Sequence, residues 1–194
     1  MKTVDRRTLL TSGVATRAIS ALPRSEAQST TSAGPFKVGA EEGRPGGLWF
    51  VHGEKTFFTK VSGADVGKRY AIIEAHTPPG LGPELHIHPL QNEMFFVLRG
   101  SIGVQCGSDH TVLNTGDSFM APAGVPHAFV ALGTEPAHTL FLFDPAGDME
   151  AFFADYSTVI DVEGEPDRKK LMEVNAKHGI KVVGPPLKAA GFAS

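Results

Sequence analysis

The chain has 194 residues, a formal net charge of -3, 41% hydrophobic and 20% charged residues, and one cysteine. This length fits one domain with tails, and the apolar content is that of a soluble protein that can bury a core. A small negative charge without a run of like charges predicts no nucleic-acid partner and no anionic membrane, so the expected partner is a small molecule. Cys106 alone cannot close an intrachain disulfide, so packing must hold the fold.

Residues 1–34 differ in composition from the rest of the chain. Arg6-Arg7 precede a mildly apolar stretch and then a Ser/Thr/Ala/Gly-rich run, which resembles a twin-arginine export signal. Ser25-Glu26-Ala27 offers a small-x-small cleavage site, whereas Arg17 interrupts the apolar stretch. The signal predicts a periplasmic or secreted protein. The alternative is a disordered tail with a chance arginine pair on a cytoplasmic protein.

From Phe36 onward the sequence shows short β-type runs separated by glycine and proline, which predicts a sandwich or barrel. Turns are expected at Arg99-Gly100 and at Asn114 to Asp117, where the glycines supply positive φ. The strands expected from these runs are Lys55–Val61, Tyr70–Thr77, Glu84–His88, Asn92–Leu98, Ser101–Cys106, Asp117–Ala121, His127–Leu132 and His138–Phe143.

The run Asn92–Leu98 is apolar on both faces. Glu93, Phe95 and Val97 alternate with the apolar residues Met94, Phe96 and Leu98. One face of such a strand belongs to the core, and the other needs a partner, which predicts a homodimer.

After Phe143 the hydrophobic period changes to that of helices. Met149, Phe152, Phe153 and Tyr156 fall at i, i+3, i+4 and i+7, which predicts an amphipathic helix whose stripe lies in the core or in an interface, with Asp144 as its N-cap. A second helix is expected from Pro166 to His178, with Gly179 as its stop. The organisation predicted is a tail over 1–34, a β barrel over 35–147, and a C-terminal helical extension and tail over 148–194.

Spacing distinguishes a few of the eight histidines from the rest. His86 and His88 are two residues apart on an expected strand, so they project to the same face and can reach one ion. Glu93 follows after a bend, and His127 follows a Gly/Pro turn. Mixed imidazole and carboxylate ligands suit Fe, Mn, Ni, Co, Cu or Zn, whereas sites of thiolate ligands would need more cysteines. His76 and His138 are weaker candidates for the cavity, and His52, His110 and His178 are expected at strand edges or near the surface.

These residues fall in register with the two sequence motifs of the cupin family, which the chain resembles. The first motif reads Gly80, five residues, His86-x-His88, four residues, Glu93, six residues, Gly100. The second reads Gly116, five residues, Pro122-x-Gly124, two residues, His127, and departs from the family only at Ala131, where Asn is usual. The resemblance implies an all-β fold, the cupin double-stranded β-helix or jelly-roll barrel, followed by C-terminal helices. It also implies one divalent transition metal bound by His86, His88, Glu93 and His127.

Segments outside the motifs resemble bacterial single-domain cupins similar to quercetin 2,3-dioxygenase, namely Leu48-Trp49-Phe50, Pro145-Ala146-Gly147 and Lys177 to Ile180. This resemblance implies a dioxygenase that acts on a flavonol, another polyphenol or a related enolisable molecule together with O2. Glu93 would then also serve as a catalytic base that takes the acidic proton of the substrate. The expected apolar substrate-binding residues include Phe95, Phe119 and Phe129, with Phe96 and Met120 as further candidates.

Two other classes of function remain open. The first is a cupin enzyme without net oxidation, such as a decarboxylase or isomerase of a small acid. Arg44 and Arg99 lie in a loop and a turn and form no obvious clamp for a carboxylate. The second is a cupin that binds a small ligand without catalysis, which the fold alone does not distinguish from an enzyme.

Overall fold

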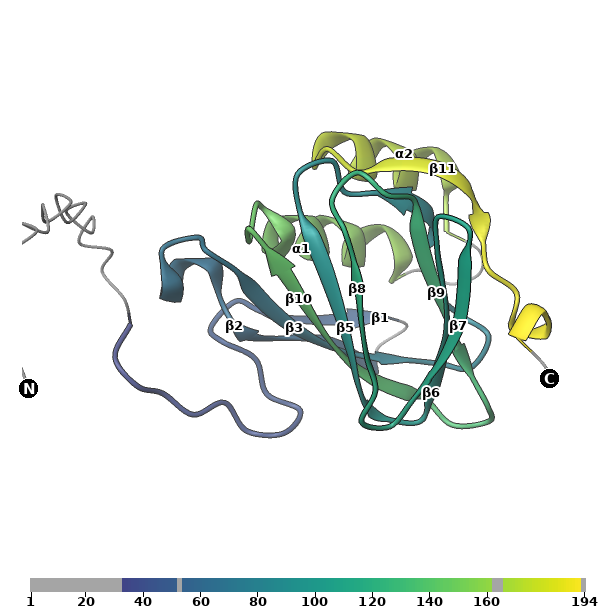
Figure 1. The fold of residues 1–194 in the computed structure, drawn as a ribbon. Coiled ribbons are helices and arrows are strands. Elements are labelled where there is room, and N and C mark those ends of the chain that lie inside the picture. The colour runs from purple at the N-terminus through teal and green to yellow at the C-terminus, as the bar shows by residue number, and fades with distance from the viewer. Residues whose placement is uncertain (1–32, 52–53, 162–165, 193–194) are drawn as a thin grey trace, which may run out of the picture.

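A computed structural model describes residues 33–51, 54–161 and 166–192. In these residues the strands form two antiparallel sheets, and two helices lie with the last strand at one end (Figure 1). None of the described helices is long and apolar enough to cross a membrane. All but the last two residues of the expected export signal lie outside the described part of the chain, so export stays a prediction.

Each sheet is built from strands that are distant in the sequence. The six-stranded sheet has the order β1 (Leu48–Val51), β2 (Glu54–Val61), β3 (Ala71–Thr77), β10 (Ala137–Asp144), β5 (Asn92–Arg99) and β8 (Ser118–Ala121). The five-stranded sheet has the order β11 (Lys181–Pro186), β4 (Glu84–Ile87), β9 (His127–Leu132), β6 (Ser101–Cys106) and β7 (Asp109–Asn114). These two sheets with C-terminal helices are consistent with the cupin jelly roll that the sequence predicts.

The predicted strands are present, with small shifts at their ends, and three further strands accompany them. β1 and β7 had no counterpart in the sequence prediction, and β7 is mostly exposed with only Leu113 buried. β11 contains Gly184 and two prolines, which sheets tolerate at an edge. Because β11 pairs with β4, residues 148–194 are more than a helical extension: they also complete the five-stranded sheet.

The turns follow the predicted glycine chemistry. Gly100 joins β5 to β6 with φ 78°, and Gly116 precedes β8 with φ 94°, a region that glycine adopts without steric cost. Short 3-10 helices occupy Gly63–Val66 and Ala189–Phe192. The tight reversals keep the paired strands in register around the interior.

The two predicted helices are α1 (Met149–Ile160) and α2 (Arg168–Lys177). The expected N-cap at Asp144 is wrong, because β10 continues to this residue, which pairs with Asn92, and Asp148 precedes α1 instead. α2 begins after Asp167, whose carboxylate accepts hydrogen bonds from two backbone N–H groups of the first turn. Gly179, with φ 76°, stops this helix as predicted.

The core lies between the sheets and beneath α1. Phe95 and Val97 of β5 are fully buried there, and Phe153 of α1 stacks on Trp49 of β1 with ring centroids 6.0 Å apart. The opposite face of β5 leaves Phe96 and Leu98 37% and 39% exposed. The homodimer stays a prediction, and this exposed face of β5 is its expected interface.

His178 ties the two helices together, although the sequence analysis expected it near the surface without a role. Its side chain is only 3% exposed. Nδ1 lies 2.6 Å from Asp148 Oδ2 and Nε2 lies 2.7 Å from Asp155 Oδ2, so an imidazolium can donate to both carboxylates. The end of α2 is thereby held against the start and the middle of α1.

Arg44 and Asp65 form a second, partly buried ion pair, between the segment that precedes β1 and the first 3-10 helix. The guanidinium donates two hydrogen bonds to the carboxylate, at 2.9 and 2.6 Å. The backbone N–H of Ser62 donates a third, at 2.9 Å. The hydrogen bonds from Arg44 hold the pKa of the Asp65 carboxyl below its usual value, although burial opposes this.

We expect Asp65→Asn to lower the melting temperature at pH 7, because the amide cannot accept the paired guanidinium as a carboxylate does. A carboxyl whose pKa is lowered by folding stabilises the fold above its unfolded pKa, roughly 3.9, and loses this contribution as pH falls through the folded pKa. The difference between wild type and variant should therefore shrink below about pH 4. Thermal melts from pH 7 to pH 2 measure this, with the exposed Asp109→Asn as control; a difference that persists unchanged at pH 2 contradicts it.

Candidate metal centre

The four predicted ligands come from both sheets. His86 lies in β4 of the five-stranded sheet, and His88 follows just after the end of that strand, on the same side. His127 is the first residue of β9 and pairs directly with His86 in the sheet register. Glu93 lies in β5 of the other sheet, so its carboxylate reaches the imidazoles across the interior.

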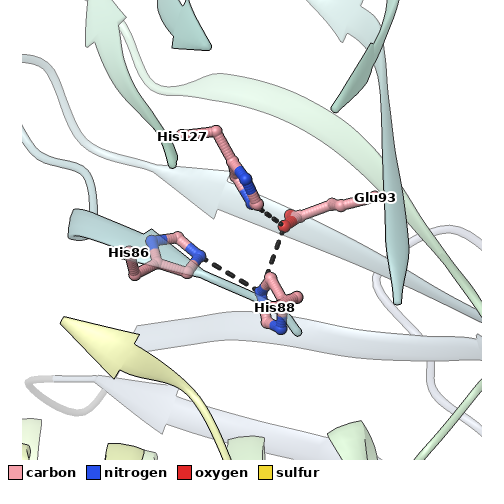
Figure 2. A group of neighbouring side chains, drawn as sticks. All are labelled: His86, His88, Glu93 and His127. Atoms are coloured by element: carbon pink, nitrogen blue, oxygen red, sulfur yellow. Dashed lines mark hydrogen bonds and ion pairs between the residues drawn. The ribbon is translucent and has the colours of Figure 1, made fainter. Parts of the chain in front are cut away.

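The side chains of these residues converge on one point (Figure 2). Glu93 Oε2 lies 3.0 Å from His127 Nε2 and 3.3 Å from His88 Nε2, and the Nε2 atoms of His86 and His88 are 3.1 Å apart. One donor atom from each of the four residues lies within 4.8 Å of all the others. The structure thus brings together the ligand set that the cupin motifs predict.

Backbone carbonyls set the proton positions of two of the imidazoles. His86 Nδ1 donates to the carbonyl of Glu84 at 2.7 Å, and His127 Nδ1 donates to that of Val125 at 2.8 Å. A neutral ring with its proton on Nδ1 directs the lone pair of Nε2 at the shared point, as second-sphere hydrogen bonds do for metal-binding histidines, whereas a protonated His127 donates from Nε2 to Glu93 instead. His88 Nδ1 is buried without a hydrogen-bond partner among the described residues.

Burial and mutual charges tune the four groups. Exposure ranges from 0% for His127 to 9% for His86. Burial, helped by the neighbouring His88, lowers the pKa of His86 to about 4, so this ring is neutral at physiological pH. Burial alone would raise the pKa of Glu93, but hydrogen bonds from His127 and His88 hold it below its usual value. Burial alone would lower the pKa of His127, but the hydrogen bond to Glu93 raises it above its usual value.

This donor set fits a divalent transition metal. Such ions require neutral imidazoles and ionised carboxylates, which the environment of His86 and Glu93 favours. Three nitrogens and one oxygen leave further positions open on a six-coordinate ion, which is typical of catalytic rather than structural centres. The donors do not discriminate among Fe, Mn, Ni, Co, Cu and Zn.

A cavity of about 450 Å³ opens beside the cluster. His86, His88 and Glu93 line it, while the remaining wall is mostly aromatic and aliphatic. This volume lies within the roughly 300–1,000 Å³ range of small-molecule pockets. His127 is fully buried and does not line the cavity. Glu93 does line it, so a molecule bound in the cavity can contact the Glu93 carboxylate.

The predicted apolar pocket residues are divided between the cavity and other places. Phe129 lines the cavity. Phe95 lies in the core, where its ring packs against Phe129, Phe119 and the imidazole of His127, and neither Phe95 nor Phe119 is among the residues that line the cavity. Phe96 and Met120 lie on the exposed face of the six-stranded sheet, since alternate residues of a strand face opposite ways.

The sequence analysis did not assign the residues of α1 to the cavity. Met149, Phe152, Phe153 and Tyr156 line it, together with Ile160. Their helical spacing in the sequence predicts only that this face of α1 is buried. The structure shows that the face borders the cavity.

The other described histidines lie away from this centre. His76 and His138 face outward on paired positions of β3 and β10, where their rings stack 3.7 Å apart beside Glu74. Lys60 already supplies a cation to the Glu74 carboxylate, with Nζ 3.1 Å from Oε2. His110 is exposed on β7, and His52 lies outside the described residues.

We expect His86→Ala, His88→Ala or His127→Ala to reduce the metal bound per chain to roughly a tenth or less, because removal of even an outer-sphere partner costs about 10–100-fold in affinity. His110→Ala is the matched control and should keep the wild-type content. Elemental analysis of the purified proteins measures this. Equal metal content in all four variants would contradict the assignment.

A family comparison places the same residues in a known domain. Residues 73–143 match the family model described as Cupin domain, and this range contains all four ligands. No curated protein sequence matches the chain closely enough to count as a relative.

Solved structures with a similar arrangement share little sequence with the chain. KdgF from Halomonas sp. is 22% identical, with a TM-score of 0.44 over 48% of this chain and 81% of that one. The TT1209 protein of Thermus thermophilus is 26% identical, with a TM-score of 0.39 over 41% of this chain and 75% of that one. A Silicibacter pomeroyi protein described as a sugar phosphate isomerase from a cupin superfamily is 22% identical, with a TM-score of 0.41 over 47% of this chain and 61% of that one.

Likenesses of this strength carry no argument about activity, and none of them points specifically to quercetin 2,3-dioxygenases. The domain match over residues 73–143, the two antiparallel sheets and the converged His/Glu cluster agree with the cupin jelly roll and its metal site that the sequence motifs predict.

Proposed function

We propose that the protein is a metal-dependent dioxygenase that acts on a flavonol, another polyphenol or a related enolisable small molecule. The observation that carries this proposal is the cavity of about 450 Å³, whose lining combines aromatic side chains with residues of the His/Glu cluster. Aromatic and aliphatic walls bind a planar apolar molecule by burial, and a few polar groups orient it. The sequence resemblance to bacterial quercetinase-like cupins supports the same class of substrate.

Glu93 would act as the base in this proposal. Its carboxylate lines the cavity and is held in its ionised form by His127 and His88. An acidic phenol or enol that enters the cavity can transfer its proton to this carboxylate, whose Oε2 lies 3.0 Å from His127 Nε2 and 3.3 Å from His88 Nε2. A divalent transition metal bound by the cluster would supply Lewis-acid and redox activation of the substrate and O2.

The walls of the cavity favour this proposal over a decarboxylase or isomerase of a small acid. Such enzymes need a cation to hold the substrate carboxylate, and arginine is the usual residue. No arginine or lysine occurs among the described residues that line the cavity, whereas Glu84 and Glu93 do. Apart from the metal, a small anionic substrate would meet two carboxylates and no lysine or arginine among the described lining residues.

We expect the metal-reconstituted protein to consume O2 when quercetin or 3-hydroxyflavone is added. Glu93→Gln should slow this reaction by about 10²–10⁴-fold, since a positioned base contributes this much to a proton transfer. An oxygen electrode and the loss of flavonol absorbance measure the rate. Metal content is measured in the same samples, and rates are compared per metal bound, because Glu93 is also a candidate ligand.

His110→Ala should keep the wild-type rate, since this exposed side chain on β7 is remote from the cavity. If the flavonol spectrum shifts on binding and no O2 is consumed with any of the candidate metals, the protein is a binding cupin and the dioxygenase proposal fails.

A further inference from the structure

Tyr156 places a single hydroxyl on the otherwise apolar face that α1 presents to the cavity. Met149, Phe152, Phe153 and Ile160 are its neighbours on that face, and its ring packs against Phe152 with centroids 5.2 Å apart. A tyrosine that served only as packing could be phenylalanine, as at the two preceding positions of the stripe. The hydroxyl is the feature of this helix face that requires an explanation.

This hydroxyl has no hydrogen-bond partner among the described residues. The groups that influence it are its own burial and the negative charge of Glu84, which together raise the pKa of Tyr156 to about 12. The hydroxyl therefore keeps its proton at physiological pH and is available as a donor. Because Tyr156 lines the cavity and is only partly buried, a molecule that occupies the cavity can supply the acceptor for this hydroxyl.

Glu84 lines the same cavity and lies on the same strand as His86 of the metal cluster. It precedes His86 by two residues on β4, so both side chains leave the strand on the same face, roughly 7 Å apart along it. Arg168 lies 3.4 Å from the Glu84 carboxylate, but it is 73% exposed and holds it only loosely. The cavity wall thus carries Glu84 and Tyr156 in addition to residues of the His/Glu cluster, and Glu84 is near enough to Tyr156 to influence its hydroxyl.

We propose that Tyr156 and Glu84 form a recognition point for an uncharged hydroxyl at the end of an aromatic ligand distal to the metal cluster. A hydroxyl suits both groups, because it accepts from the Tyr156 O–H and donates to the Glu84 carboxylate. A carboxylate at the same position would be repelled by Glu84. This inference rests on the proposed function in that the proximal end of the ligand engages the His/Glu cluster.

The test compares ligands with and without the distal hydroxyl. Metal-loaded protein is titrated anaerobically with 3-hydroxyflavone, 3,7-dihydroxyflavone and 3,4′-dihydroxyflavone, and binding is followed by absorbance and fluorescence. Wild type should bind at least one of the dihydroxyflavones about five- to tenfold more tightly than 3-hydroxyflavone, as expected for one hydrogen bond with a buried partner. Tyr156→Phe should abolish this preference, so that the variant binds the dihydroxyflavones no more tightly than 3-hydroxyflavone, while its metal content stays that of wild type.

Two controls separate recognition from general damage. The chain has one other tyrosine, Tyr70, which does not line the cavity, so Tyr70→Phe should keep the preference. Glu84→Gln removes the charge but keeps an acceptor. It should therefore improve binding of the 4′-carboxylate of 3-hydroxyflavone at least tenfold relative to wild type.

The outcomes also separate this inference from the proposed function. If wild type shows no preference for a distal hydroxyl, or if Tyr156→Phe keeps it, the recognition point is refuted. If no flavonol binds, the flavonol proposal fails, and 4-hydroxybiphenyl against 4-methylbiphenyl decides the remaining question: a preference for the hydroxyl that depends on Tyr156 supports the recognition point, and equal binding refutes it.

Discussion

The candidate site depends on one interaction, the contact of the buried Glu93 carboxylate with the imidazoles of His127 and His88. An isolated carboxylate in an apolar interior would be strongly destabilising, and it persists here because two nitrogens lie 3.0 and 3.3 Å from the same oxygen. The interaction joins the two sheets, since Glu93 belongs to one and the histidines to the other. It therefore positions the strands as well as the donor atoms.

The surroundings of this contact suit a metal. Backbone carbonyls direct the protons of His86 and His127 away from the shared point, and burial keeps His86 neutral. The chain thus prepares lone pairs and a negative charge in a small volume before any ion binds, which reduces the reorganisation that binding requires.

About half of the residues that line the cavity lie outside residues 73–143, the segment that carries this cluster. The four candidate donors belong to residues 86–127, whereas part of the cavity wall comes from α1, α2 and β11. His178 clamps the two helices to each other, and β11 joins them to the edge of the sheet that carries His86. Changes in this C-terminal segment can alter which molecule fits while the ligands stay in place, which is the separation that the role proposed for Tyr156 requires.

The sequence by itself predicted the four candidate ligands, through the resemblance to the cupin motifs. Part of this prediction is local, because His86 and His88, two residues apart on a strand, share a face, and glycines turn the chain at Gly100 and Gly116. The helix stripe of α1 was equally local. Only the tertiary structure decided that Glu93 reaches the histidines from the opposite sheet, that β11 adds an edge strand despite its prolines, and that Tyr156 rather than Phe95 faces the cavity. These three features depend on how the two sheets pack together and where the helices pack on them. The burial pattern of one segment predicts that it is buried, but it does not identify the distant segment that packs against it.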